Sequence, residues 1–547
     1  MDLLQGRRQQ QEMLRINQLK LAPDHTEQEL KKALLTTVHL KEEELLEYHI
    51  HKRSIDARKK PTIFYSYAID FQVKNEERIL KKAKNKVQKV FQKAYEFPKA
   101  GTMKLRHRPI IVGAGPAGLF CAYSLAVQGY QPILVERGAM VEERMQDVEK
   151  FWNTGILNPK SNVQFGEGGA GTFSDGKLNT LVKDKFGRNN FVLETFVKFG
   201  ADPAILYEQK PHIGTDVLAC VVSNMRREIL SLGGEVRFHA QVTGFVFEGS
   251  EKSDRHLKQI IINNSEKIDC DVLILAIGHS ARDTFKVLYD EGIPMQAKSF
   301  AVGVRIEHPQ KMIQEAQYGK EMADLFPAAA YKLTTQLENK RGVYTFCMCP
   351  GGYVVNASSE EGKLAVNGMS YHDRSGENAN SAVIVTVTPQ DYKSDSPLAG
   401  IAFQRNLEER AYQIGQGNIP VQCYKDFCDN IPTEKLGDIR PQMKGNYRLA
   451  NVRAIFPDEL AKSIEQGILN MDHKIHGFAR EDALLSGVES RTSSPVKILR
   501  EESFESTCKG IYPCGEGAGY AGGITSAAMD GMKVAEAIIK KYEAFSS

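Results

Sequence analysis

The hydrophobic pattern of the chain has its clearest feature just after residue 105. Three apolar residues, Ile110–Val112, are followed at once by Gly113-x-Gly115-x-x-Gly118 and then by apolar positions with helical spacing. This order predicts a short buried parallel strand, a tight glycine turn and a helix. Tyr130–Glu136 is a second apolar run and predicts the next strand of the same sheet.

A separate unit precedes this motif. Met13–Leu21 predicts a strand, Thr26 and Glu29 have the spacing of a capping box that opens a helix, and Thr62–Val73 alternates as a long strand. The simplest assembly is a small βαββα domain of ferredoxin-like character over residues 1–104.

A third block of patterned segments follows residue 297. Strands are predicted at Ser299–Ile306, Gly342–Cys347 and Ala382–Val387, and helices at Pro397–Gln413 and Pro457–Met471. We expect an α+β domain of residues 297–500 inserted into a Rossmann-like α/β domain. The α/β domain then consists of residues 105–296 and 501–547.

The glycine motif also predicts a dinucleotide site. Gly113 permits the turn out of the strand, Gly115 lets the backbone approach a pyrophosphate, and Gly118 lets the helix pack closely on the sheet. The phosphates then meet the helix N-terminus. Glu136 lies 23 positions after Gly113. This is near the offset of about 20 at which an acid accepts hydrogen bonds from ribose hydroxyls and disfavours a 2′-phosphate. An ordinary glycine turn in an α/β domain is the alternative.

Further motifs indicate which dinucleotide to expect. Asp271–Gly278 resembles the strand-and-glycine motif by which two-dinucleotide flavoproteins and their relatives return to the FAD domain. Ile511–Gly517, with Gly522–Thr525 after it, resembles their C-terminal FAD motif. The resemblance implies that FAD is the tightly held cofactor. It also implies that Glu516, where Asp is commoner, contacts the ribityl and pyrophosphate region.

Four other segments make the resemblance closer. Together they resemble the bacterial family of FAD-dependent dehydrogenases of unassigned substrate; they are Asn162–Leu178, Ala301–Pro309, Cys349–Tyr353 and Val488–Pro495. The resemblance extends from about Leu105 to the C-terminus. It implies a glutathione-reductase-like FAD domain of the kind with a single nucleotide-binding domain, and an inserted substrate or cap domain.

The expected cofactor site combines these motifs with a glycine-rich stretch. Between Gly166 and Gly176, exposed backbone N–H groups would bind an anion or the edge of a flavin, and a flexible surface lid is the alternative. Lys177 would add charge at the phosphates, and by resemblance the backbone at Val242 would lie beside the adenine. The expected cofactor-binding residues are Gly113, Gly115, Pro116, Ala117, Gly118, Glu136, Arg137, Arg144, Gly168, Gly169, Gly171, Lys177, Val242, Ala276, Gly278, Gly515, Glu516, Gly523, Ile524 and Thr525.

The sequence identifies no catalytic residue, only candidates. His279 follows a strand end where a proton-transfer group would be useful near a reduced flavin, although such a loop also simply packs on FAD phosphates. By resemblance Glu489 and Arg491 would enter the site from the cap, with a structural ion pair as the alternative. Cys347 and Cys349 are the one close pair among nine cysteines. Their C-x-C spacing leaves open a redox role or a buried strand position, and no metal-ligand cluster is found.

Composition and charge add less. The chain is 42% hydrophobic and 25% charged, which is ordinary for a soluble protein, and it has no apolar run of signal-peptide or membrane-span length. We therefore expect a cytoplasmic protein without a membrane partner. Residues 1–108 carry 24 Lys and Arg against 14 Asp and Glu, a net charge of +10, whereas the whole chain has +3. This asymmetry suggests an acidic partner such as a nucleic acid, unless the lysines form a solvated helix face or a linker.

These features predict an FAD-dependent oxidoreductase of dehydrogenase type that acts on a small-molecule substrate under the cap. No second strand–G-x-G-x-x-G–helix unit is found, so NAD(P)H would bind only transiently as a reductant. One alternative is an FAD-dependent monooxygenase that uses NAD(P)H. The other is an RNA-associated flavoprotein that uses its basic N-terminal domain. The oligomeric state is open.

Overall fold

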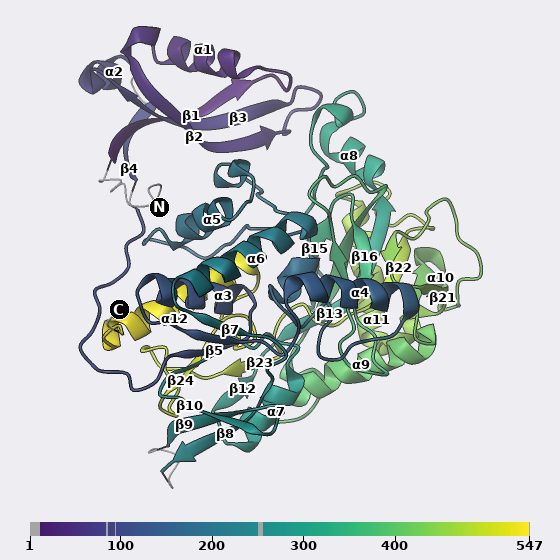
Figure 1. Ribbon diagram of the computed structural model, residues 1–547. Coiled ribbons are helices and arrows are strands. Elements are labelled where there is room, and N and C mark those ends of the chain that lie inside the picture. The colour runs from purple at the N-terminus through teal and green to yellow at the C-terminus, as the bar shows by residue number, and fades with distance from the viewer. Residues whose placement is uncertain (1–10, 84–85, 93, 250–254, 546–547) are drawn as a thin grey trace.

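The computed structural model describes residues 11–83, 86–92, 94–249 and 255–545 (Figure 1). Its N-terminal domain, residues 11–92, is a four-stranded antiparallel sheet of order β2-β3-β1-β4 with both helices on one face. Thr26 and Glu29 form the predicted capping box. The element order is βαββαβ, so the structure adds a last strand to the predicted βαββα unit. The elements are β1 Gln11–Leu21, α1 Glu27–Thr37, β2 Leu45–Asp56, β3 Phe64–Val73, α2 Glu76–Lys82 and β4 Val87–Gln92.

The N-terminal domain contacts the remainder of the chain through β2 and β3. The backbone N–H of Arg53 donates to the carbonyl of Tyr207 over 2.7 Å, and the Arg53 guanidinium pairs with Glu208. The ring of Tyr65 packs on that of Phe326 with centroids 5.5 Å apart. Polar and apolar contacts therefore both hold the domain in place.

A five-stranded parallel sheet forms the centre of the second domain. Its order is β24-β11-β5-β6-β7, so the last strand of the chain completes a sheet that begins more than 100 residues from the N-terminus. The carboxyl ends of parallel strands share one edge, and ligands of such sheets bind there. The strands are β5 Ile110–Val112, β6 Ile133–Val135, β7 Glu235–Arg237, β11 Leu273–Leu275 and β24 Ile511–Pro513.

Helices cover this sheet, and a small antiparallel sheet of order β10-β9-β8 lies next to it (Figure 1). The helix after β5, α3 Pro116–Val127, is buried along almost its whole length because α12 and α6 pack against it. This explains why its sequence is apolar on every side. The other elements of the domain are α4 Val141–Thr154, α5 Arg188–Lys198, α6 Thr215–Ser231, β8 Val242–Glu248, β9 His256–Ile262, β10 Glu266–Asp269, α7 Arg282–Asp290 and α12 Ile524–Lys541.

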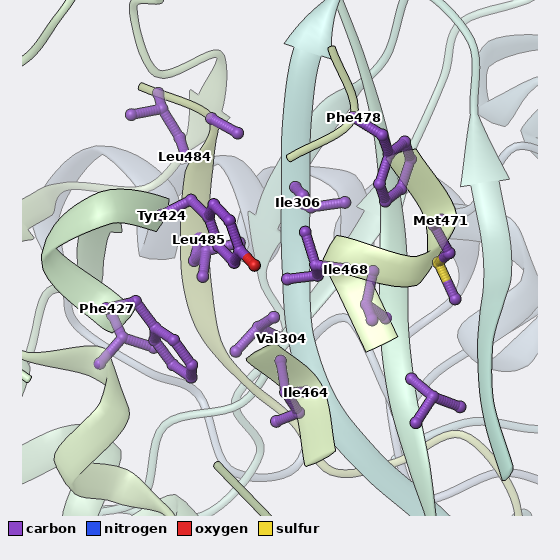
Figure 2. Close-up of a cluster of buried hydrophobic side chains, with 14 of the residues drawn as sticks. Val304, Ile306, Tyr424, Phe427, Ile464, Ile468, Met471, Phe478, Leu484 and Leu485 are labelled. Atoms are coloured by element: carbon purple, nitrogen blue, oxygen red, sulfur yellow. The ribbon is translucent and has the colours of Figure 1, made fainter. Parts of the chain in front are cut away.

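The segment predicted to form the cap, residues 297–500 and called the cap below, contains a seven-stranded sheet of order β14-β15-β18-β13-β22-β19-β21. Apolar side chains from β13, β22, α10 and α11 meet in its core, as Figure 2 shows for Val304, Ile306, Phe427 and Ile464. The elements of the cap and its margin are β12 Met295–Ala297, β13 Phe300–Pro309, α8 Gln310–Tyr318, β14 Thr334–Gln336, β15 Gly342–Cys349, β16 Tyr353–Asn356, β17 Val366–Met369, β18 Asn378–Val387, α9 Ala399–Gly415, β19 Ile419–Cys423, α10 Tyr424–Asp429, β20 Met443–Lys444, β21 Tyr447–Leu449, α11 Asp458–Asp472, β22 Leu484–Glu489 and β23 Val496–Ile498.

Candidate functional site

Two glycines of the turn between β5 and α3 are required by the protein itself. Gly113 has a φ of 103°, and a Cβ on it would lie 2.4 Å from the carbonyl oxygen of Ala276. A Cβ on Gly118 would lie 1.8 Å from the carbonyl oxygen of Gly113. Only glycine therefore lets the chain turn here and lets α3 pack this closely on the strand.

Gly115, the middle glycine, has no such internal reason. Its backbone is extended, with φ −75° and ψ −178°, and the nearest protein atom to an added Cβ is the Cα of Gly169 at 3.8 Å. The space in front of α3 is therefore open. The N-terminus of α3 lacks a side-chain cap, and Pro116 occupies a position where its missing N–H costs nothing. Open space and uncapped N–H groups, which Ala117 and Gly118 contribute to, suit a phosphate.

Glu136 follows β6 and holds the turn in place. Its Oε2 accepts the backbone N–H of Ala114 over 2.8 Å, while Oε1 accepts those of Gly138 and Gly166 over 2.9 and 3.0 Å. Each carboxylate oxygen has two acceptor sites, so Oε2, which accepts one N–H group, can still accept a hydroxyl. Glu136 therefore ties the glycine turn to the glycine-rich loop, and its contact with a ribose stays a prediction.

The glycine-rich loop, Asn162–Gly176, lies directly on the β5–α3 turn. The backbone N–H of Gly168 donates to the carbonyl of Ala114 over 2.8 Å, and a Cβ on Gly169 would lie 3.0 Å from the Cα of Gly115. Arg144 is fully buried and donates to five loop carbonyls, those of Asn162, Val163, Gly166, Glu167 and Gly169. All these donors are used within the protein, so Arg144 shapes the loop.

The C-terminal motif closes the other side of this space. Cβ atoms on Gly515 and Gly517 would lie 2.7 Å from the Cβ of Ala117 and 2.6 Å from the carbonyl carbon of Gly278. The predicted segments around Gly115, Gly278 and Gly515 therefore meet at one place. Gly523 precedes α12, which again has no side-chain cap.

The loop and α12 also touch each other. A Cβ on Gly171 would lie 3.2 Å from Cγ1 of Ile524, and the Thr525 hydroxyl donates to the carbonyl of Leu178 over 2.8 Å. Thr525 therefore anchors the loop through its side chain. Its backbone N–H, in the first turn of α12, still faces the uncapped end of the helix.

The residues present fit FAD. Added Cβ atoms at Gly278 and Gly522 would meet no protein atom within 4 Å. An added Cβ at Gly115 would meet none closer than 3.8 Å. The buried Nδ1 of His279, beside the same space, has no hydrogen-bond partner within the described residues. Two uncapped helix N-termini, an acid at a strand end and open glycines thus surround one space, as a dinucleotide requires.

Two other expected cofactor residues have charged partners in the protein, and a third is buried. Arg137 pairs with Asp283 over 2.9 Å and lies over the ring of Phe165. The Nζ of Lys177 is 3.6 Å from Asp175, and Val242 is a buried residue at the start of β8. Their contacts with a cofactor stay predictions.

His279 and Glu516 lie next to each other, with Nε2 and Oε1 3.7 Å apart. Burial, with the charges of Arg491 and Arg282, lowers the pKa of His279 to about 3, so its imidazole is neutral at pH 7. Burial raises the pKa of Glu516 to about 7. The pair can therefore hold or release one proton near neutral pH, on the carboxyl group.

The other two catalytic candidates are engaged in buried ion pairs, though not with each other. Glu489 accepts from Arg305 over 3.1 Å, and burial raises its pKa to about 7. Arg491 donates to both oxygens of Glu408, over 3.0 and 2.8 Å. These contacts are of the structural kind that the sequence left as the alternative.

Sequence reasoning missed the centre of this second pair. Glu408 on α9 also accepts from Arg282 over 2.7 and 2.8 Å and from the Ser490 hydroxyl over 2.6 Å. Through Arg282, Glu408 joins α7, near the candidate FAD site, to α9 of the cap. The available signal was the position of this charged residue on the helix. Glu408 lies seven residues after Ile401 and three before Ala411, a spacing that assigns it to the buried face.

A buried carboxyl in the cap gives a test of pH dependence. Glu307 is fully buried, and burial raises its pKa to about 7, although Gln442 and Asn378 donate to it. A raised carboxyl pKa stabilises the fold at low pH, and this stabilisation is lost as pH rises through 7. In the wild type, the free energy of unfolding should fall between pH 5.5 and 8 as Glu307 ionises. We expect this fall to be smaller by about 2 kcal/mol in Glu307→Gln, measured by denaturant unfolding at both pH values. An unchanged pH dependence would contradict the assignment.

Several basic residues of the N-terminal domain form ion pairs. Lys20 and Arg58 share Asp56, Arg15 binds Asp70, and Lys31 binds Glu42. These pairs use part of the positive charge that suggested an acidic partner. Binding of nucleic acid stays a prediction.

Within the described part of the chain, no group of three or more His, Cys, Asp or Glu side chains is arranged to hold a metal ion. No helix among those residues combines the length and apolar character needed to cross a membrane.

Comparisons with known proteins give two family matches and several similar structures. Residues 299–492 match the family described as FAD-dependent protein, C-terminal domain-like, and residues 13–72 match a domain of unknown function, DUF8436. Among solved structures, the chain resembles a triple mutant of the flavin-dependent brominase Bmp2, with TM-score 0.36, 11% identity and 79% of each chain covered. It also resembles a flavoprotein/dehydrogenase from Cytophaga hutchinsonii, with TM-score 0.34, 13% identity and coverage of 79% and 76%.

A much closer relative exists among curated sequences. An uncharacterised protein of Clostridium beijerinckii is 48% identical over 538 residues, which cover 97% of this chain and 99% of the relative. The chain therefore belongs to the same family as this clostridial protein, and it carries the C-terminal domain of an FAD-dependent protein over residues 299–492.

Proposed function

We propose that the protein is an FAD-dependent oxidoreductase of dehydrogenase type that acts on a small-molecule substrate beneath the cap. The observation that carries this proposal is Gly115, which leaves open space at the uncapped N-terminus of α3 beside Glu136. The match of the cap to an FAD-dependent protein domain supports it independently.

The chain's own groups would divide the work of binding. The turn Gly113–Gly118 would hold the pyrophosphate and Glu136 the ribose hydroxyls. The first N–H groups of α12, after Gly523, would stabilise negative charge on the flavin ring. FAD, when bound, accepts a hydride or an electron pair and passes it on.

Glu516 and His279 would manage protons beside that ring. Because the pKa of Glu516 is about 7, its carboxyl group can donate or accept a proton at neutral pH, while His279 stays neutral. Lys298, whose charge acts on Glu516, would favour the carboxylate form. The cap would exclude water from the reacting centre.

An absorbance experiment tests the proposal. The purified protein is expected to be yellow with about one FAD per chain, and an anaerobic titration with NADH and then NADPH shows whether either bleaches the flavin band. Bleaching followed by rapid oxygen consumption would favour the monooxygenase alternative, and a flavin that ignores both would point to another electron acceptor. A colourless protein that cannot be reconstituted with FAD would overturn the proposal.

A further inference from the structure

Two cysteines at the end of β15 have an unusual local geometry. The pairing of β15 with β18 shifts by one residue between Phe346 and Cys349, which marks a β-bulge. Cys347, inside the bulge, has a φ of 44°. Non-glycine residues adopt this left-handed conformation only where their surroundings hold them in it, and bulges are frequent next to active sites.

The bulge brings the two thiols together. Residues two apart in a regular strand have Cα atoms about 6.6 Å apart, near the upper end of the roughly 4.4–6.8 Å span of disulfides. A bulge bends the strand and shortens that separation. The Cys349 thiol donates to the carbonyl oxygen of Cys347 over 3.2 Å.

The two thiols differ in environment. Cys347 is half-buried, and the hydrogen bond from Cys349, with the charges of Lys177 and Arg305, lowers the pKa of its thiol to about 6. Cys349 is fully buried, and burial raises its pKa well above the usual value. Arg305 donates to the Cys347 carbonyl over 2.7 Å and lies 3.7 Å from the Cys349 sulfur. One accessible thiolate beside one buried thiol is the arrangement of an attacking and a resolving cysteine.

The pair lies where the cap meets the candidate FAD site. The charge of Cys347 raises the pKa of Glu516, in the C-terminal motif, and that of Glu489, in the cap. Lys177 and Asp175, which act on the Cys347 thiol in turn, belong to the end of the glycine-rich loop. Groups from both sides of the space that α12 faces thus converge on Cys347.

We propose that Cys347 and Cys349 are a redox-active pair that exchanges electrons with the bound flavin, an inference that rests on the proposed function. In the oxidising direction, the two thiols lose two protons and two electrons and form one S–S bond. The oxidised flavin takes up the two electrons and is reduced, and the protons pass to the flavin and to solvent. The reverse reaction returns both thiols.

A reductive titration of the full-length protein tests this. The air-oxidised protein, with its FAD content measured first, is titrated anaerobically with dithionite. The flavin and the disulfide each accept two electrons. We therefore expect about two two-electron equivalents of dithionite per flavin in the wild type and about one in Cys347→Ser and Cys349→Ser. Cys220→Ser, at an exposed site on α6, should behave as the wild type. If the wild type also takes up only one equivalent per flavin, the proposal is wrong.

Mass spectrometry gives a second readout that does not depend on flavin chemistry. In the oxidised wild type, the peptide that carries both residues should be about 2 Da lighter than in the reduced protein and should resist alkylation. Both serine variants should lose this signature while keeping their FAD. If Cys347 and Cys349 stay alkylatable in the oxidised protein, the pair is not redox-active. A protein without FAD would instead defeat the proposed function, and the first absorbance spectrum would show it.

Discussion

Gly115→Val is expected to abolish FAD binding and to leave the fold intact. The backbone of Gly115 is extended, so a valine can adopt it, and the nearest protein atom to its Cβ is 3.8 Å away. The side chain would fill the space where a pyrophosphate must approach the N-terminus of α3. We expect the flavin content per chain, read from absorbance, to fall at least about tenfold, with circular dichroism and thermal unfolding of the flavin-free protein close to those of flavin-free wild type.

Two other glycines provide the controls. Gly342→Val lies at the start of β15 in the cap, away from the candidate FAD site. Its Cβ would lie 3.6 Å from the Thr386 hydroxyl, and the variant should keep full flavin. Gly118→Ala drives a Cβ into the carbonyl oxygen of Gly113 and should lower both stability and flavin content. A Gly115→Val protein that purifies with full flavin would show that the open space serves something other than phosphates.

The local motifs of this site were readable from the sequence because each has a short-range cause. Gly113 and Gly118 are fixed by contacts within a dozen residues or by a neighbouring strand, and Glu136 follows its strand at the expected offset. The capping box of Thr26 and Glu29 is likewise a local pattern. Short-range rules of turn and cap chemistry therefore sufficed to predict these elements.

Long-range partners were beyond such reasoning. The sequence predicts Arg144 as a cofactor-binding residue, and it cannot show that the guanidinium donates to carbonyls that the loop presents only after folding. Glu489 and Arg491 stand two residues apart and suggest a mutual pair. However, β22 ends at Glu489, so Arg491 lies beyond the strand and does not share its face. The two side chains therefore meet different partners, Arg305 and Glu408, from other elements. The bulge that joins Cys347 and Cys349 depends on pairing with β18 and has no signature in the three residues themselves.

Glu408→Ala is expected to destabilise the protein by about 3–5 kcal/mol, because it leaves Arg282 and Arg491 buried without their shared counter-charge. Both arginines are almost fully buried, and Glu408 is completely so. The lost carboxylate is also the link between α7, beside the candidate FAD site, and α9 of the cap. We therefore expect lower thermal stability and weaker retention of flavin together, measured by unfolding monitored with protein and flavin fluorescence.

Neighbouring and conservative variants separate the charge from the side chain. Glu409→Ala, on the exposed face of the same helix, loses only a 3.8 Å pair with Lys363 and should change stability by less than about 0.5 kcal/mol.

Glu408→Gln keeps the shape of the side chain and tests its charge. Burial opposes ionisation of Glu408, but Arg282 and Arg491 outweigh it and hold its pKa well below the usual range. A depressed carboxyl pKa stabilises the fold above the unfolded-state pKa, and this stabilisation is lost as pH falls. The difference in the free energy of unfolding between wild type and Glu408→Gln should therefore be constant from pH 8 to 6 and shrink below about pH 4.5. A gap that instead grows on acidification would mean that Glu408 is protonated in the folded protein and that the two arginines are held by their other partners.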